Sequence, residues 1–169
     1  MDEFAHIPPP FEQALRLHEA EIMRFLMRST RDHEDALDLF QETWLRAYRA
    51  YPRLDSAAGL RPWLYRIATN LCLNRTRARV RRSRVIADDP MPDEPQSAAA
   101  AHTNSASQDG VIHLRAAIER LPRKQRSALI MRKFGGLEYH EIALALECSC
   151  ESARAGVYQA LKKLKAMLE

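Results

Sequence analysis

Residues 35–48 read DALDLFQETWLRAY, and their apolar side chains recur at intervals of three and four residues. This spacing predicts an amphipathic helix, which we place at about 33–51 with Asp32 as its N-cap. The inward stripe is expected to consist of Ala36, Leu37, Phe40, Trp44, Leu45, Ala47, Tyr48 and Tyr51. The stretch is typical of a helix with one packed face and one exposed face.

The same periodicity extends to both sides of this helix. It predicts an earlier helix from Phe11, after a tail at 1–10 whose three consecutive prolines prevent helix formation. A third helix is expected to start near Pro62, after a turn-rich loop at 52–59, and to continue into an arginine-rich stretch. Four further helices are expected at 111–121, 123–134, 138–146 and 150–168.

Residues 86–110 differ in composition from the rest of the chain. They contain three prolines, four consecutive alanines and no aromatic residue, which is too little apolar bulk to form a core. We interpret this segment as a flexible linker. The chain of 169 residues is then an all-α protein with two small helical domains, at 11–85 and 111–169.

Charge is distributed in blocks along the chain. Residues 61–84 hold eight arginines and no acid, whereas residues 85–110 hold five acids and no basic residue. An arginine block is typical of a surface that binds the phosphate backbone of nucleic acid. A solvated helix face has the same composition, so charge alone leaves both interpretations open.

The last two predicted helices have the spacing of a helix-turn-helix. Ala143 is small enough to let the second helix approach closely, and Ser149 can cap that helix. Its outward face would present groups suited to bases and phosphates, namely Ser152, Arg154, Tyr158, Gln159 and Lys162. The pattern fits equally a helical hairpin with only a packing role.

Asp38, Gln41 and Glu42 lie three and four residues apart, so they share one face of the helix at 33–51. Such a patch either solvates the helix or docks on a basic protein surface.

The third helix combines aromatic and basic groups, which suits unstacked single-stranded bases. Trp63 is in phase with the core, whereas Tyr65 and Asn70 fall off the inward stripe and are expected to be exposed.

The sequence contains no recognisable catalytic set. Its six histidines are scattered, and its three cysteines lack a C-x-x-C pair. We expect no enzyme activity, no metal, no cofactor and no small-molecule substrate. Since no apolar stretch approaches the roughly 18 residues that span a bilayer, we expect a soluble, cytoplasmic protein without membrane insertion.

Two segments of the first domain, 35–48 and 62–72 (PWLYRIATNLC), resemble region 2 of the extracytoplasmic-function (ECF) sigma factors of bacteria. Residues 121–126 (LPRKQR) and 136–143 (GLEYHEIA) resemble region 4 of the same family. The resemblance implies a sigma factor that binds core RNA polymerase, directs it to promoters and assists promoter melting. An anti-sigma factor is a further partner that it implies.

The resemblance also implies roles for individual residues. Polymerase would be bound by Asp38, Gln41, Glu42 and Arg46. Minus-ten promoter DNA would be bound by Arg61, Tyr65, Arg66, Asn70, Arg75 and Arg77, and a flipped base would be captured by the loop at 52–61. The outward face of the last helix would read the minus-thirty-five element.

Region 4 departs from the family pattern at several positions. Glu147 stands where the turn usually has glycine, Gly156 stands where arginine is common, and lysines replace arginines at 162, 163 and 165. We therefore expect weak or unusual reading of the minus-thirty-five element.

Two alternatives remain open at the level of sequence. One is a stand-alone helix-turn-helix regulator that binds duplex DNA without polymerase. The other is a sigma-like adaptor that works by protein sequestration. The patch of Asp38, Gln41 and Glu42 and the block at 62–72 argue against the first, because a simple repressor needs neither.

Overall fold

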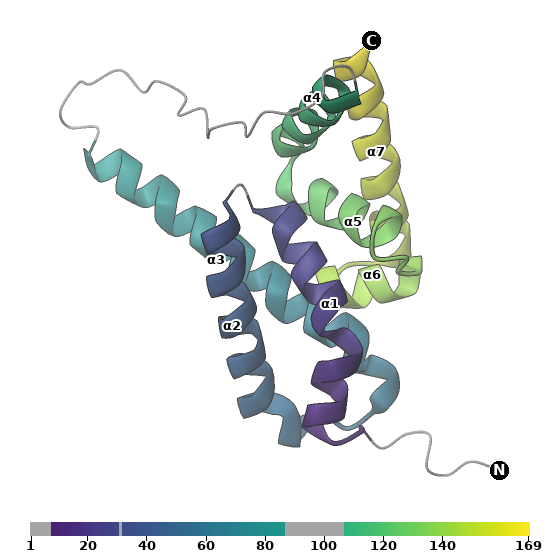
Figure 1. The fold of residues 1–169 in the computed structure, drawn as a ribbon. Helices are drawn as coiled ribbons and strands as arrows, with labels where there is room; N and C mark the ends of the chain where they lie inside the picture. The colour runs from purple at the N-terminus through teal and green to yellow at the C-terminus, as the bar shows by residue number, and fades with distance from the viewer. Residues whose placement is uncertain (1–7, 31, 87–106) are drawn as a thin grey trace.

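The computed structural model describes residues 8–30, 32–86 and 107–169, so most of the linker predicted at 86–110 lies outside the described residues. All the regular secondary structure in this part of the chain is helical, which confirms the all-α prediction (Figure 1). The helices are α1 Phe11–Ser29, α2 His33–Ala50, α3 Leu60–Ile86, α4 Ser107–Arg120, α5 Arg123–Lys133, α6 Tyr139–Leu146 and α7 Cys150–Leu168. Short 3-10 turns, Tyr51–Arg53 and Ala57–Gly59, join α2 to α3.

Local signals in the sequence set most helix ends. The Asp32 carboxylate accepts a hydrogen bond from the backbone N–H of Glu34 at 3.4 Å, and the Ser149 hydroxyl accepts one from Ser152 at 3.1 Å. Both residues therefore act as the predicted N-caps. The helix α4 begins at Ser107, four residues before its predicted start.

The helices α1, α2 and α3 form an N-terminal unit around a shared core (Figure 1). The predicted inward stripe of α2 is partly wrong, because Leu37, Leu45 and Tyr48 are exposed. Leu39 and Thr43 are buried in their place. Thr43 tolerates burial because its hydroxyl donates a hydrogen bond to the Leu39 carbonyl at 2.6 Å.

The helices α4 to α7 form a C-terminal unit in which α6 and α7 make the predicted helix-turn-helix. Ile142 and Ala143 of α6 are buried with Ala153 and Val157 of α7. At the turn between the two helices, Glu147 adopts a left-handed conformation with φ of 51°. It is the one non-glycine residue with positive φ in the described part of the chain.

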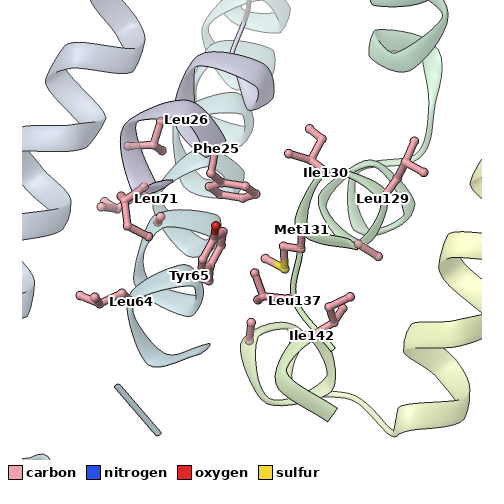
Figure 2. Packing of buried hydrophobic residues seen from close by; sticks show 14 of the residues in the cluster. Phe25, Leu26, Leu64, Tyr65, Leu71, Leu129, Ile130, Met131, Leu137 and Ile142 are labelled. Carbon is pink, nitrogen blue, oxygen red and sulfur yellow. The ribbon is translucent and has the colours of Figure 1, made fainter. Parts of the chain in front are cut away.

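The two units pack against each other, with α6 on α3 and α5 on α1. Figure 2 shows Phe25 and Tyr65 of the N-terminal unit facing Ile130, Met131 and Leu137 of the C-terminal unit. All five side chains are buried. The buried apolar side chains therefore form a cluster that runs across the boundary between the two units.

Two glycines of the C-terminal unit are expected to respond to substitution in opposite directions. Gly136 has φ of +66°, so Gly136→Ala is expected to lower the free energy of unfolding by about 1 kcal/mol. Gly156 lies inside α7, where a Cβ would make an ordinary 3.8 Å contact with Ala128. Gly156→Ala is expected to raise the free energy of unfolding by about 1 kcal/mol. Urea denaturation of the two variants measures both changes, and a shift of the same sign would contradict this account.

Candidate functional site

The residues predicted to bind polymerase lie on a mixed face of α2. Asp38, Gln41 and Arg46 are exposed, and Arg46 forms an ion pair with Glu42 at 2.6 Å. The three apolar residues that the sequence placed inward, Leu37, Leu45 and Tyr48, are exposed on the same helix, with exposed fractions of 38%, 45% and 61%. Sequence reasoning missed this apolar contribution because it assigned these three residues to the buried stripe of α2.

Asp38 belongs to a second ion-pair cluster at the contact between α2 and α3. The Arg75 guanidinium lies 3.2 Å from the Asp38 carboxylate and also pairs with Asp35. The structure thus brings together one residue predicted for polymerase and one predicted for DNA.

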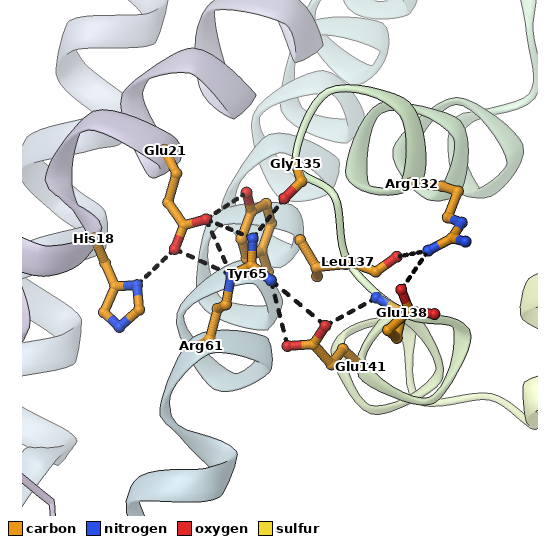
Figure 3. A network of polar contacts seen from close by, with 9 residues as sticks. All are labelled: His18, Glu21, Arg61, Tyr65, Arg132, Gly135, Leu137, Glu138 and Glu141. Atoms are coloured by element: carbon orange, nitrogen blue, oxygen red, sulfur yellow. Dashed lines mark hydrogen bonds and ion pairs between the residues drawn. The ribbon is translucent and has the colours of Figure 1, made fainter.

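The Arg61 side chain, at the start of α3, is the centre of a polar network (Figure 3). Its guanidinium lies 2.9 Å from Glu21 of α1 and 3.5 Å from Glu141 of α6. It also donates a hydrogen bond to the Gly135 carbonyl. On the other side of Glu21, His18 approaches the carboxylate at 2.5 Å. Arg61 therefore joins the two units through side chains that are far apart in sequence.

The charges in this network shift the pKa values of its members. Burial alone would raise the pKa of Glu21, but hydrogen bonds from His18 and Arg61 outweigh it and hold the pKa below its usual value. Burial and the neighbouring Glu21 carboxylate raise the pKa of Tyr65 well above its usual value. Glu21 is therefore ionised, and Tyr65 neutral, at physiological pH.

The prediction that Tyr65 is exposed is wrong. Only 1% of this residue is exposed, and its ring packs edge-on against Phe25 with centroids 5.1 Å apart. The side chain is covered because α1 and the C-terminal unit meet over this face of α3 (Figure 2). Asn70 and Arg77 are exposed as expected, and Trp63 packs partly buried against the core as predicted.

The outward face of α7 has the predicted exposure. Its members Ser152, Arg154, Tyr158, Gln159 and Lys162 are all exposed. The ring of Tyr139, in α6, lies 5.3 Å from the Arg154 guanidinium and 4.9 Å from that of Arg132. Tyr139 thus lies against two cationic groups beside α7. No local pattern in the sequence predicts that Arg132 reaches this face.

A groove of about 530 Å³ lies between the two units. Its lining includes Cys72, Arg75 and Arg79 from α3 and Arg123 and Arg126 from α5. Burial raises the pKa of the Cys72 thiol to about 12. No group of side chains suited to a metal ion occurs among residues 8–30, 32–86 and 107–169. Within the same ranges, no helix has the length and apolar character needed to cross a bilayer.

The three cysteines are expected to react with iodoacetamide at very different rates. The thiolate is the reacting species, so Cys72 should be modified at least about 100-fold more slowly than the exposed Cys150 at pH 8. Burial also raises the pKa of Cys148, which should react at an intermediate rate. Mass spectrometry of the modified peptides gives the rates. In urea the three cysteines should react at similar rates. Equal rates in the folded protein would refute the expectation.

Both helical units match regions of one protein family. Residues 15–82 match sigma-70 region 2, and residues 113–164 match sigma-70 region 4. The fold and the two matches together define a sigma-70 type transcription initiation factor, a class of proteins without enzymatic activity.

Similar proteins of known name identify the subgroup of sigma-70 factors. The chain is 30% identical to the ECF RNA polymerase sigma-E factor of Salmonella typhimurium over 75% of its own length and 70% of that protein. It is 29% identical to the RNA polymerase sigma-H factor of Pseudomonas aeruginosa over 94% of its own length and 86% of the relative. It also spans 62% of the ECF sigma factor SigE of Mycolicibacterium smegmatis, at 30% identity. The chain belongs to the ECF family of sigma-70 factors, which direct transcription initiation by RNA polymerase.

Solved structures share the fold over both units. The sigma factor RpoE of Bartonella quintana, solved in complex with the anti-sigma factor NepR, matches with a TM-score of 0.74 and 22% identity, over 94% of this chain and 96% of RpoE. CnrH, solved in complex with the cytosolic domain of CnrY, matches with a TM-score of 0.69 and 19% identity, over 94% of this chain and 86% of CnrH.

Proposed function

We propose that the exposed face of α2 is the main docking surface for core RNA polymerase. The observation that carries this proposal is the exposure of Leu37, Leu45 and Tyr48 beside the charged and amide groups of Asp38, Gln41, Glu42 and Arg46. Apolar anchors next to oriented charges are typical of protein interfaces, where the apolar groups supply affinity and the charges fix orientation.

The exposed surface of α3 is our candidate for the site that binds minus-ten promoter DNA. Its exposed or half-exposed groups, Arg66, Asn70, Arg75 and Arg77, follow one another along the helix, and Arg61 and Tyr65 precede them. In Figure 1 the arginine-rich half of α3 extends beyond α1 and α2. Guanidinium groups on such a projecting helix suit contacts with DNA phosphates, and the turns between α2 and α3 suit capture of an unstacked base.

The minus-thirty-five element is assigned to α7. Its outward side chains supply hydrogen-bonding groups for base edges, while Arg154, Lys162 and the neighbouring Arg132 supply charges for phosphates. We further propose a cytoplasmic location and regulation by an anti-sigma factor. The second proposal is supported by the structural similarity to RpoE, which was solved in complex with the anti-sigma factor NepR.

Run-off transcription with purified core polymerase tests the assignment. We expect initiation that needs both the polymerase and this chain, and we expect minus-ten mutations to reduce it more than minus-thirty-five mutations do. Duplex binding by the chain without polymerase would favour the stand-alone regulator. Polymerase binding without initiation at any promoter would favour the adaptor. Equal loss from mutations in the two elements would contradict weak reading by α7.

A further inference from the structure

The C-terminal unit covers part of the α3 face that we assign to minus-ten DNA. Arg61 lies 3.5 Å from Glu141 and donates a hydrogen bond to the Gly135 carbonyl. Arg66 lies 3.4 Å from Glu147. Tyr65 is buried at the same boundary. Three of the six residues assigned to this DNA are thus engaged at the boundary with the C-terminal unit before any DNA arrives, and a fourth, Arg75, pairs with Asp35 and Asp38 of α2.

Glu21 of α1 also pairs with Arg61, at 2.9 Å, but the acidic groups of the C-terminal unit that engage α3 come from one short element. Glu141 lies in the first turn of α6, and Glu147 caps the end of that helix. In Figure 3, the Glu141 carboxylate points from α6 toward Arg61 at the start of α3. Carboxylates and phosphates bind guanidinium groups through similar charge-assisted hydrogen bonds. The two acids therefore occupy α3 arginines much as DNA phosphates would.

Glu147 is the more informative of the two acids. Its φ of 51° is a conformation that glycine adopts without steric penalty and that a glutamate does not favour. The turn by itself would be better served by glycine, but glycine cannot supply a carboxylate to Arg66. This local strain indicates that the charge at position 147 has a use that the turn does not explain.

We infer that α6 carries an intramolecular stand-in for DNA: Glu141 and Glu147 occupy Arg61 and Arg66 and keep the chain closed until polymerase and promoter DNA displace them. This inference rests on the proposed function of α3 in minus-ten binding. Both ion pairs are partly exposed to solvent, with side-chain exposures of 29% and 19% for the first and 41% and 65% for the second. Partly exposed pairs are weak and are screened by salt, so the closed state can be opened.

Apolar contact also contributes to the closed state. Phe25 and Tyr65 lie against Met131 and Leu137 (Figure 2), and the Arg28 guanidinium lies 4.6 Å from the ring centroid of Phe134. Removing the two acids is therefore expected to shift the balance between closed and open chains and not to abolish closure.

The double variant Glu141→Gln, Glu147→Gly tests the inference in the full chain. Glutamine preserves the capping box that Glu141 forms with Glu138, and glycine suits the left-handed turn, so both changes are compatible with the fold. The control Glu12→Gln, Glu19→Gln removes the same two charges from exposed positions on α1. Binding of a fluorescent single-stranded minus-ten oligonucleotide, without polymerase, is measured by anisotropy. The radius of gyration is measured by small-angle X-ray scattering at low and high salt.

We expect the test variant to bind the oligonucleotide about 3- to 10-fold more tightly than the control, because two exposed ion pairs together contribute a factor of this order. Its radius of gyration at low salt should exceed that of the wild type, and adding Phe134→Ala should increase it further. A test variant that matches the control in both measurements overturns the inference. Where neither chain binds the oligonucleotide, the scattering result decides.

Run-off transcription with core polymerase separates this inference from the proposed function. If the wild type and the test variant both initiate while the polymerase-free measurements show no difference, the inference fails and the proposed function stands. If neither chain initiates although the test variant opens, the proposed function fails, and the inference that rests on it fails with it.

Discussion

Glu42→Lys is expected to weaken binding of core RNA polymerase by at least about 30-fold, because reversing a charge within a complementary interface places like charges together. Glu42 is partly exposed on the face of α2 that we assign to polymerase, and it pairs with Arg46 at 2.6 Å. The transcription rate at limiting polymerase should fall in proportion to the loss of affinity. Fluorescence anisotropy with labelled sigma factor measures the affinity.

The matched control is Glu19→Lys, which makes the same charge change at an exposed position on α1. It should leave polymerase affinity within about twofold of the wild type, because distant exposed charges are screened at physiological salt. Equal losses from the two substitutions would place the docking surface elsewhere. Unchanged affinity in Glu42→Lys would remove Glu42 from it.

Ile142→Ala is expected to lower the free energy of unfolding by about 2–5 kcal/mol, the usual result of deleting buried methyl groups that the surroundings cannot replace. Ile142 is fully buried in α6, where this helix meets α7 on one side and α3 on the other. Urea denaturation followed by circular dichroism measures the change. A loss of this size is a large fraction of the total, since small domains are only marginally stable.

Leu144→Ala provides the control for this substitution. Leu144 lies two residues further along the same helix and is 58% exposed. Its truncation should change the free energy of unfolding by less than about 0.5 kcal/mol. A similar loss in both variants would contradict this account, because Ala is a better helix former than Ile or Leu and burial would then not distinguish the two positions.

The groove between the units and the Arg61 network show how closely the two halves depend on each other. Glu21 of α1 and Glu141 of α6 share one guanidinium, so a substitution in either unit changes the environment of the other. Measurements on an isolated half would remove these contacts. The experiments above therefore use the full chain.

Sequence alone determined the features that depend on nearby residues. Asp32 and Ser149 are caps because their side chains reach N–H groups two or three residues ahead. The helix-turn-helix followed from the apolar period of 138–168, and the outward exposure of Arg154 and Tyr158 followed from the same period. The family followed from short motifs that local spacing preserves.

Tertiary structure alone decided which faces are covered. Thr43 looks polar in a periodicity pattern, yet it is buried, which its hydroxyl tolerates by bonding within its own helix. Leu45 and Tyr48 face outward instead. Tyr65 was predicted to be exposed and is buried, because α1 and the C-terminal unit close over it.

Arg61 and Arg66 are predicted DNA contacts, but their pairing with Glu141 and Glu147 spans about 80 residues of sequence. Local periodicity reports only on neighbours within a few turns, so no pattern in the chain could place these groups side by side. The sequence therefore identified the helices, their ends and the family. Packing between the units decided which of the proposed DNA-binding groups are open to solvent and which are held by the protein itself.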